Sequence, residues 1–344
     1  MSSPSITLLD LKTGTQYPCP LPSDHPYRYA VALGNFDGVH AAHRELISTA
    51  INTACQRTAL GHPTRAAAWC FRTLSSDYFS ASPRGHLTTL EEKLSLFAAC
   101  GLSYVFLVDF PSVRTLLPSD FIDIILRQYC AVEAVCCGFN YHFGRDGQGD
   151  SAMLFGAFGA LCTVLPCYRM REDGELCWDE CENAPIISSS EIRRLLQIGS
   201  CEFAAKMLRR PYMVTSVVEY GKQLGRTLGL PTANQTIPPS KLIPKYGVYA
   251  SVCVIDGVRY FGVSNIGCRP TVDGENTRVN CETHFLDFKG DLYGKELCVY
   301  LLHKLRDEIK FSDVNALRTA ILSDIQKARQ YVESPAALQL LKMI

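Results

Sequence analysis

The chain has 344 residues, enough for two or three ordinary domains, each with its own hydrophobic core. Hydrophobic residues make up 47% of the chain and charged residues 20%, and both shares are typical of a globular protein. The 34 lysines and arginines equal the 34 aspartates and glutamates in number. This balance excludes a basic field over the whole protein for nucleic acid, and the sequence has no acidic tail.

The sixteen cysteines are scattered, and they do not form the paired C-x-x-C spacing of a zinc site. No apolar run approaches the roughly 20 residues that cross a membrane. The N-terminal stretch MSSPSITLLDLKTGTQ lacks the basic and apolar regions of a secretory signal. We therefore expect a cytoplasmic protein with reduced thiols and with neither membrane nor nucleic-acid partners.

The first half of the chain alternates between short apolar strands and amphipathic helices. The segments expected as strands are RYAVALGNFDG, RAAAWCF, YVFLVDF and AVEAVCCGFNYHFG. Helices are expected over residues 41–59, 88–101 and 117–130, with Thr88 or Thr89 and Ser119 as caps. This alternation predicts a parallel sheet with helices on its faces, a fold that binds ligands at the carboxyl ends of its strands.

The second half reads as strands that need no helices between them. From Met213 onward several runs alternate apolar and polar residues, and the IDGVRY segment carries the Asp-Gly signal of a tight hairpin. An antiparallel sheet or small barrel fits, followed by a helix that Ser312 or Asp313 caps. We place the boundary near Arg210–Pro211, which gives domains over residues 1–205 and 211–344.

The stretch GNFDGVHAAH, residues 34–43, joins the first apolar strand to a helix through a glycine-flanked turn. The N-terminus of a helix binds anions readily, and His40 and His43 lie on one face of its start. Paired imidazoles beside backbone amides suit a polyphosphate. A polar turn with surface histidines explains the same spacing, and the residues alone leave both interpretations open.

The stretch also resembles the G-x-F-D-G-[VL]-H-x-G-H signature of the bacterial riboflavin kinase/FAD synthetase family. The matching positions are Gly34, Phe36, Asp37, Gly38, Val39, His40 and His43. Three later segments, HLTTLEEKLSLFAACG, GFNYHFGRDGQGD and SSSEIRRLL, are similar to further motifs of that family in the same order. Two features depart from it: Ala42 replaces a glycine, and the family's F-x-P-H-P loop is absent after Phe71.

The resemblance implies an α/β nucleotidyltransferase-like domain in which an FMN phosphate attacks the α-phosphorus of ATP and pyrophosphate leaves. It implies that His40 and His43 hold ATP phosphates as catalytic residues. The other positions implied to bind ATP or its phosphates are Gly34, Phe36, Asp37, Gly38, Ser189, Ser190 and Arg193. Asn140 is implied to lie beside the flavin or the adenine ribose. Without the resemblance, the serines equally mark a plain helix start and Asn140 a loop asparagine.

A second glycine-rich stretch, GKQLGRTLGLPTAN, covers residues 221–234. Its glycines let backbone amides approach a phosphate, but its spacing is not that of a P-loop. Thr232 and Asn234 offer neutral oxygens that Mg²⁺ accepts when phosphates supply the rest of its shell. A glycine-rich hairpin loop is the alternative interpretation.

This stretch closely resembles the kinase signature of the same family, as do GVYA, NIGCRPTV, CETHFLDFKGDLYGKEL and LRDEIKF after it. The resemblance implies a riboflavin kinase β-barrel with Glu282 as the base for the ribityl hydroxyl. Strand alternation places Glu282 and His284 on one face, opposite Thr283. The implied ATP-binding residues are Gly221, Gly225, Arg226, Thr232 and Asn234, with Thr232 and Asn234 on Mg²⁺. Asn265 and Arg306 are implied flavin or nucleotide contacts, although Arg306 equally suits a surface ion pair.

The resemblance thus predicts a bifunctional enzyme that makes FMN from riboflavin and FAD from FMN, with ATP as co-substrate and Mg²⁺ in both steps. One alternative keeps only the kinase, because Ala42 and the absent Pro-His-Pro loop weaken the first domain's match. Another is a flavin-binding regulatory module without turnover. The sequence leaves the oligomeric state open.

Overall fold

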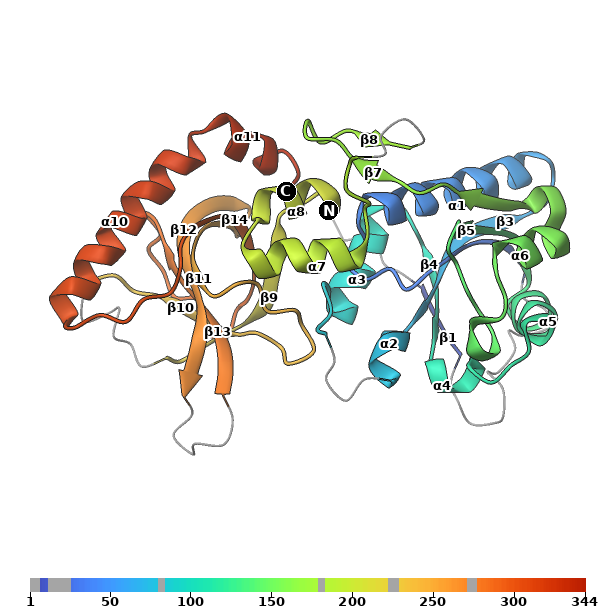
Figure 1. Ribbon diagram of the computed structural model, residues 1–344, viewed down its shortest axis with the longest axis horizontal. Coiled ribbons are helices and arrows are strands. Elements are labelled where there is room, and N and C mark those ends of the chain that lie inside the picture. The colour runs from blue at the N-terminus through green and yellow to red at the C-terminus, as the bar shows by residue number, and fades with distance from the viewer. Residues whose placement is uncertain (1–6, 12–25, 80–83, 179–182, 222–228, 271–276) are drawn as a thin grey trace. The chain divides into compact units, whose positions relative to one another are not determined.

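The computed structural model describes residues 7–11, 26–79, 84–178, 183–221, 229–270 and 277–344 (Figure 1). The chain divides into two compact units, Met1–Ser188 and Ser189–Ile344. This division precedes the expected boundary at Arg210–Pro211, because the two intervening helices, α7 (Ser189–Ile198) and α8 (Cys201–Leu208), group with the second unit. Helix α8 packs against two strands of that unit, β9 (Tyr212–Glu219) and β14 (Glu296–Arg306).

The first unit is built on a six-stranded parallel sheet with the order β1-β4-β3-β2-β5-β6. Its strands are β1 (Thr7–Leu11), β2 (Arg28–Leu33), β3 (Thr64–Phe71), β4 (Tyr104–Val108), β5 (Val132–Gly138) and β6 (Cys162–Leu165). The predicted parallel sheet is therefore confirmed. Buried, near-continuous apolar strands such as β2 are what a sheet covered on both faces requires.

Helices and short elements connect these strands. The helices are α1 (Ala41–Ala59), α2 (Ser75–Tyr78), α3 (Leu90–Ala99), α4 (Phe110–Val113), α5 (Pro118–Asp120) and α6 (Ser151–Phe158). A π-helix, η1 (Phe121–Tyr129), and two 3₁₀ turns, η2 (Arg145–Gly147) and η3 (Gly159–Leu161), complete them. A separate two-stranded ribbon follows, with β7 (Arg169–Met170) and β8 (Leu176–Cys177).

Helix α3 begins and ends as its sequence predicts. Thr89 is the N-cap and forms a capping box with Glu92. Gly101, just past the end, has φ +89°, a conformation that favours glycine. The expected cap at Ser119 is wrong: Leu117 is the N-cap of α5, because Pro118 takes the first helical position and leaves Ser119 inside the helix.

The second unit is a closed antiparallel barrel with the strand order β10-β13-β12-β11-β14-β9. Its strands are β9 (Tyr212–Glu219), β10 (Ala233–Thr236), β11 (Gly247–Ile255), β12 (Val258–Pro270), β13 (Thr277–Phe285) and β14 (Glu296–Arg306). The predicted hairpin turn joins β11 to β12, and Asp256 and Gly257 both have positive φ there. The expected small barrel is confirmed.

Helix α10 (Val314–Val332) follows the barrel and packs against β11, β12 and β14 (Figure 1). Asp313 is its N-cap. Its buried side chains are only Asp324 and Ala328 among the residues that the structure describes. A last helix, α11 (Pro335–Leu341), contacts α8 and α10.

Two further observations bear on the environment of the protein. Within the described ranges, no helix combines the length and the apolar character that crossing a membrane requires. The cysteines in the same ranges are free thiols.

Candidate active sites

The turn after β2 is a tightly folded structure in which three residues have positive φ: Phe36 (51°), Gly38 (82°) and Val39 (41°). The ring of Phe36 is fully buried, and it packs edge-on against Phe97 with ring centroids 5.2 Å apart. A Cβ at Gly34 would lie 3.2 Å from the Phe36 ring, so a glycine fits this approach. Gly34 and Phe36 therefore shape the turn.

The segment before α3 holds this turn in place. The carboxylate of Asp37 accepts a hydrogen bond from the Leu87 amide at 2.9 Å, and the Gly38 amide donates to the Thr88 hydroxyl at 3.2 Å. The ammonium of Lys93 donates to the Asn35 carbonyl at 3.1 Å. Asp37 and Thr88 are buried. Two motifs some fifty residues apart in sequence thus form one unit. The sequence offered Thr88 only as a possible helix cap and pointed to no individual role for Leu87 or Lys93.

His40 and His43 lie at the start of α1 as the sequence predicts. His40 is the N-cap, and its Nδ1 accepts a hydrogen bond from the His43 amide at 3.4 Å. The two rings are stacked, with centroids 3.6 Å apart and an interplanar angle of 13°. Burial, followed by the nearby charges of His40 and Lys93, lowers the pKa of His43 well below its usual 6.5. His43 is therefore neutral at pH 7, and its Nδ1 is buried without a hydrogen-bond partner among the described residues.

A cavity of about 340 Å³, here called the sheet-edge cavity, lies at the carboxyl ends of four neighbouring strands. Asn35 follows β2, Phe71 ends β3, Phe110 follows β4 and Tyr141 follows β5. Phe143 and five other phenylalanine and tyrosine rings line the cavity. This is the edge at which parallel sheets bind ligands. Asn140 is exposed in the same loop but does not line the cavity.

The segment that departs from the expected Pro-His-Pro loop has contacts of its own. The Arg72 guanidinium donates to the Asp109 carboxylate at 3.1 Å, and the Asn35 amide contacts the Ser75 hydroxyl at 3.5 Å. Ser75 lines the sheet-edge cavity. Ala42, the other departure, lies in the first turn of α1 and is partly buried.

Ser189 and Ser190 open α7, and Arg193 lies one turn further along it. All three belong to the second unit. Their expected place beside His40 and His43 stays a prediction.

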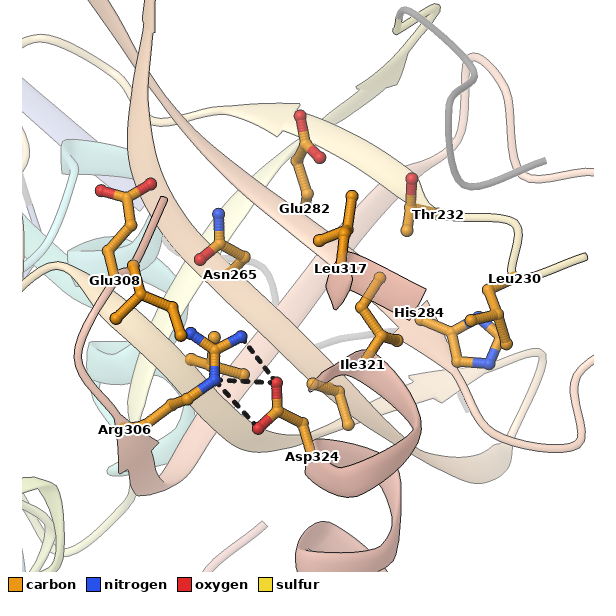
Figure 2. Close-up of a pocket in the computed structure, with 13 residues that line it drawn as sticks. Leu230, Thr232, Asn265, Glu282, His284, Arg306, Glu308, Leu317, Ile321 and Asp324 are labelled. Carbon is orange, nitrogen blue, oxygen red and sulfur yellow. Dashed lines mark hydrogen bonds and ion pairs between the residues drawn. The ribbon is translucent and has the colours of Figure 1, made fainter. Parts of the chain in front are cut away.

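One row of cross-strand partners in the barrel brings the predicted kinase residues together. Asn234 on β10 lies opposite Glu282 on β13, and Glu282 lies opposite Asn265 on β12. Val248 on β11 continues the row from Asn265 to Arg306 on β14. Directly opposite residues project from the same face of a sheet, so these side chains share one side of the barrel wall. Figure 2 shows Glu282, Asn265 and Arg306 around one cavity.

That cavity, here called the helix-side cavity, has a volume of about 190 Å³. Val248 and Val263 of the barrel and Leu317 and Ile321 of α10 form its apolar surfaces. Glu282 and His284 both line it, whereas Thr283 is fully buried, as strand alternation predicts. No local pattern pointed to Leu317 and Ile321, because their position depends on how α10 docks against the barrel.

Arg306 has an ion pair inside this cavity. Its guanidinium donates three hydrogen bonds to Asp324 of α10 at 2.8 to 3.0 Å (Figure 2). Asp324 is 2% exposed. Of the two interpretations from sequence, the structure contains the ion pair, but at the wall of a cavity and not on an open surface.

Asn234 offers an oxygen suited to a hard cation. Its side-chain amide donates to the Thr232 carbonyl and hydroxyl at 3.4 and 3.5 Å, while its Oδ1 is buried without a partner in the described part of the chain. A Cβ at Gly221 would lie 2.6 Å from the Asn234 amide nitrogen, so glycine leaves room for this side chain. Gly225 and Arg226, also predicted to bind ATP, lie outside the described residues.

A second cavity of about 280 Å³, the loop-side cavity, lies beside the first and is lined by Pro231, Phe288, Lys289 and Tyr293. Thr232 lines both cavities. In the described residues no group of three His, Cys, Asp or Glu side chains is placed to hold a metal ion. A cation at Thr232 would therefore depend on oxygens from Thr232, Asn234 and a bound ligand.

Comparisons with known proteins divide the chain in the same way. The sequence model of the FAD synthetase family matches residues 23–169, and that of the riboflavin kinase family matches residues 208–332. These stretches contain the turn at Gly34 to His43 and the barrel row, respectively.

Three curated relatives cover most of the chain. They are bifunctional riboflavin kinase/FMN adenylyltransferases from Pseudomonas fluorescens, Bacillus subtilis and Escherichia coli, 32%, 31% and 32% identical. The alignments cover 86%, 92% and 88% of this chain and 91%, 96% and 92% of the relatives. A crystal structure described as a macrolide-efflux protein from Streptococcus pneumoniae is 26% identical, with a TM-score of 0.76, over 94% of this chain and 99% of that one.

Proposed function

The chain belongs to the bifunctional riboflavin kinase/FMN adenylyltransferase family, and from this premise we propose how its residues carry out the two reactions. The barrel unit phosphorylates riboflavin to FMN. The α/β unit adenylylates FMN to FAD and releases pyrophosphate. Both steps consume ATP.

The observation that carries the kinase assignment is that the helix-side and loop-side cavities share Thr232. A phosphoryl group passes between two bound molecules whose reacting ends must meet in line. We assign the flavin to the helix-side cavity, because apolar side chains and Glu282 line it together. ATP then occupies the loop-side cavity, with its phosphates directed toward Thr232.

Glu282 acts as the base in this assignment. The acceptor is a ribityl hydroxyl, which has a high pKa, so a carboxylate that accepts its proton assists attack on the γ-phosphorus of ATP. The new oxygen–phosphorus bond forms as the bond to ADP breaks. Thr232 and Asn234 would hold Mg²⁺, which neutralises phosphate charge when bound; the unpartnered Asn234 oxygen supports this.

The adenylyltransferase step needs no strong base, because the attacking FMN phosphate is already an anion. Its oxygen bonds to the α-phosphorus of ATP while the bond to pyrophosphate breaks. His43, neutral through its lowered pKa, then serves with His40 as a hydrogen-bond donor to the ATP phosphates at the N-terminus of α1. Asp37 and Gly38 support this step indirectly, since they fix the turn to Leu87 and Thr88.

The flavin of this second reaction fits the sheet-edge cavity. Aromatic walls bury a flat heteroaromatic ring effectively, and Phe71, Phe110 and Tyr141 supply them. Asn35 belongs to the turn over residues 34–43, here called the phosphate-holding turn, and it lines the same cavity. Ser189, Ser190 and Arg193 are proposed to meet the pyrophosphate end, and Asn140 the rim of the cavity.

The two assignments are tested by chromatography of products from two starting flavins. Riboflavin with Mg-ATP should give FMN, then FAD, with ADP and pyrophosphate as co-products. FMN with Mg-ATP should give FAD and pyrophosphate alone. A chain with kinase activity only would stop at FMN, as Ala42 and the missing Pro-His-Pro loop would allow. A regulatory flavin-binding module would release no ADP.

We also propose a cytoplasmic location. Flavin phosphorylation draws on ATP, and the cysteines of the described ranges are free thiols, as in reducing compartments. Riboflavin, FMN and ATP are the proposed small-molecule partners.

A further inference from the structure

The sheet-edge cavity contains one arginine that no part of the proposed chemistry uses. Arg114 lines the cavity directly after α4, and its guanidinium carbon lies 5.0 Å from the centroid of the Tyr78 ring. Among the described residues, no carboxylate forms an ion pair with it. Its side chain is partly buried. A guanidinium that is positioned but has no anionic partner has hydrogen-bond donors available for a ligand.

Aromatic packing fixes the place of Arg114. Tyr78 contacts Phe79 and Phe110 with ring centroids 5.3 and 5.7 Å apart, and Phe79 contacts Phe110 at 5.7 Å. Phe79 and Phe110 both line the cavity. The stacked guanidinium therefore lies at a wall of rings, and the cation–π contact with Tyr78 holds it there.

The strand order separates Arg114 from the phosphate-holding turn. His40 follows β2, whereas Arg114 follows β4, and β3 lies between these two strands. Neighbouring strands are about 4.8 Å apart, so the two strand ends are separated by roughly 10 Å. A flavin whose phosphate reaches toward His40 would place its ring system, and not its phosphate, beside Arg114.

We propose that Arg114 is a specificity-determining residue of the adenylyltransferase site, where it donates hydrogen bonds to the oxygen-bearing edge of the flavin ring. This inference rests on the proposed binding of FMN in the sheet-edge cavity. The pyrimidine side of the isoalloxazine ring carries two carbonyl oxygens. The fork of a guanidinium offers parallel N–H donors to such oxygens, and hydrogen bonds from a charged donor are the stronger kind.

The test compares a ligand with a phosphate to a ligand without one. FMN is the substrate, and pyrophosphate release gives its KM and kcat. Lumiflavin has the same ring but neither ribityl chain nor phosphate, so the kinase cannot phosphorylate it, and its inhibition constant against FMN reports ring binding alone. Arg114→Met keeps the apolar stem and removes the donors. Arg145→Met is the matched control, because Arg145 lies in the neighbouring loop, donates to the Thr115 carbonyl and does not line the cavity.

We expect Arg114→Met to raise the KM for FMN and the inhibition constant of lumiflavin by the same factor, about tenfold or more. The kcat should change much less, and Arg145→Met should leave both constants unchanged. A rise in the KM for FMN with an unchanged lumiflavin constant would overturn the proposal, since Arg114 would then bind the phosphate. No change in either constant would overturn it as well.

Arg114→Lys provides a second test in case Arg114→Met does not fold. It keeps the charge and loses the paired donors, so both constants should again rise together, and a wild-type result for this variant would contradict the geometry proposed here. Failure of the proposed function gives a different result, because the unmodified chain would then release no pyrophosphate from FMN and ATP.

Discussion

Asn234 and Glu282 are direct cross-strand partners on β10 and β13. Glu282 lines the helix-side cavity, and the Asn234 amide donates to Thr232, which lines both cavities of the barrel. Because opposite side chains in an antiparallel pair lie about 5 Å apart at Cβ, the proposed metal ligand and the proposed base are held by the same pair of strands. The pairing of β10 with β13 thus sets the position of the proposed metal ligand relative to the proposed base.

The first prediction concerns Glu282. Glu282→Gln keeps the shape of the side chain and removes its basicity, so the rate of FMN formation should fall by roughly 10²–10⁴-fold. FAD formation from supplied FMN should continue. Glu219→Gln is the control, since Glu219 also lies opposite Asn234 but lines neither cavity. Product analysis with each starting flavin checks the result, and loss of both activities would contradict the division of labour.

The second prediction concerns the space beside Asn234. Gly221→Ala places a Cβ 2.6 to 2.8 Å from three atoms of the Asn234 side chain, which must then move. Overpacking of this kind costs about 1–3 kcal/mol, so the KM for Mg-ATP in the kinase reaction should rise roughly tenfold. Gly156→Ala, in open space on α6, should leave it unchanged. An unaltered KM in Gly221→Ala would separate Asn234 from ATP binding.

The third prediction tests how the phosphate-holding turn is supported. Thr88→Val removes the hydroxyl that accepts from the Gly38 amide, and an unsatisfied buried donor costs about 1–3 kcal/mol. Both tryptophans of the chain, Trp69 and Trp178, belong to the first unit, so their fluorescence during urea unfolding reports on it. FAD formation should decline while FMN formation persists. Thr88→Ser keeps the hydroxyl and should retain most of the stability; equal loss in both variants would argue against this hydrogen bond.

The fourth prediction compares two ion pairs on α10. Asp324→Ala leaves Arg306 without its partner at the cavity wall, and breaking a buried pair costs about 3–5 kcal/mol. The KM for riboflavin should rise, because Leu317 and Ile321 lie on the same helix. Asp287→Ala breaks the exposed pair with Arg329 and should have little effect. Hydrogen exchange of α10 measures both, and similar protection in the two variants would count against an anchoring role for Asp324.

The fifth prediction follows from the lowered pKa of His43. The unfolded chain, with an ordinary histidine pKa near 6.5, binds more protons than the folded one as pH falls below that value. His43 therefore does not lower the free energy of unfolding above about pH 6.5. Below that pH, it lowers this free energy further as the solution becomes more acidic. Urea unfolding followed by tryptophan fluorescence at pH 7.5 and 5.5 should show a smaller loss for His43→Gln than for the unmodified chain. Equal losses would mean that His43 is not the responsible group.

Much of the fold was predictable because its signals are local. The Asp256–Gly257 turn, the Thr89 capping box and the alternation at Glu282, Thr283 and His284 all depend on neighbours within a few residues. Ser119 misled the prediction because Pro118 already offered a stronger helix start. The parallel sheet followed from the alternation of apolar strands and helices in the first half, and the barrel from the strand pattern that begins at Met213.

The surroundings of the candidate sites were harder to predict, since they depend on contacts between distant segments. The partnership of Asp37 with Leu87, and the docking of Asp324 against Arg306, join residues 50 and 18 positions apart. Burial lowers the pKa of His43, and no pattern in the neighbouring sequence predicts that burial. The family motifs pointed to the residues of the turn and most of those in the barrel row. The contacts that hold these residues in place became visible only in the structure.

The closed barrel has a consequence for how kinase activity is lost. Its six strands form a continuous ring, and the row from Asn234 to Arg306 takes one residue from each of five of them. The row crosses the four seams β10–β13, β13–β12, β12–β11 and β11–β14, so opening the barrel at any of these four separates the groups that must act together. A barrel opened at one of these seams would therefore be inactive as a kinase. The rate of FMN formation thus reports whether the barrel is closed there.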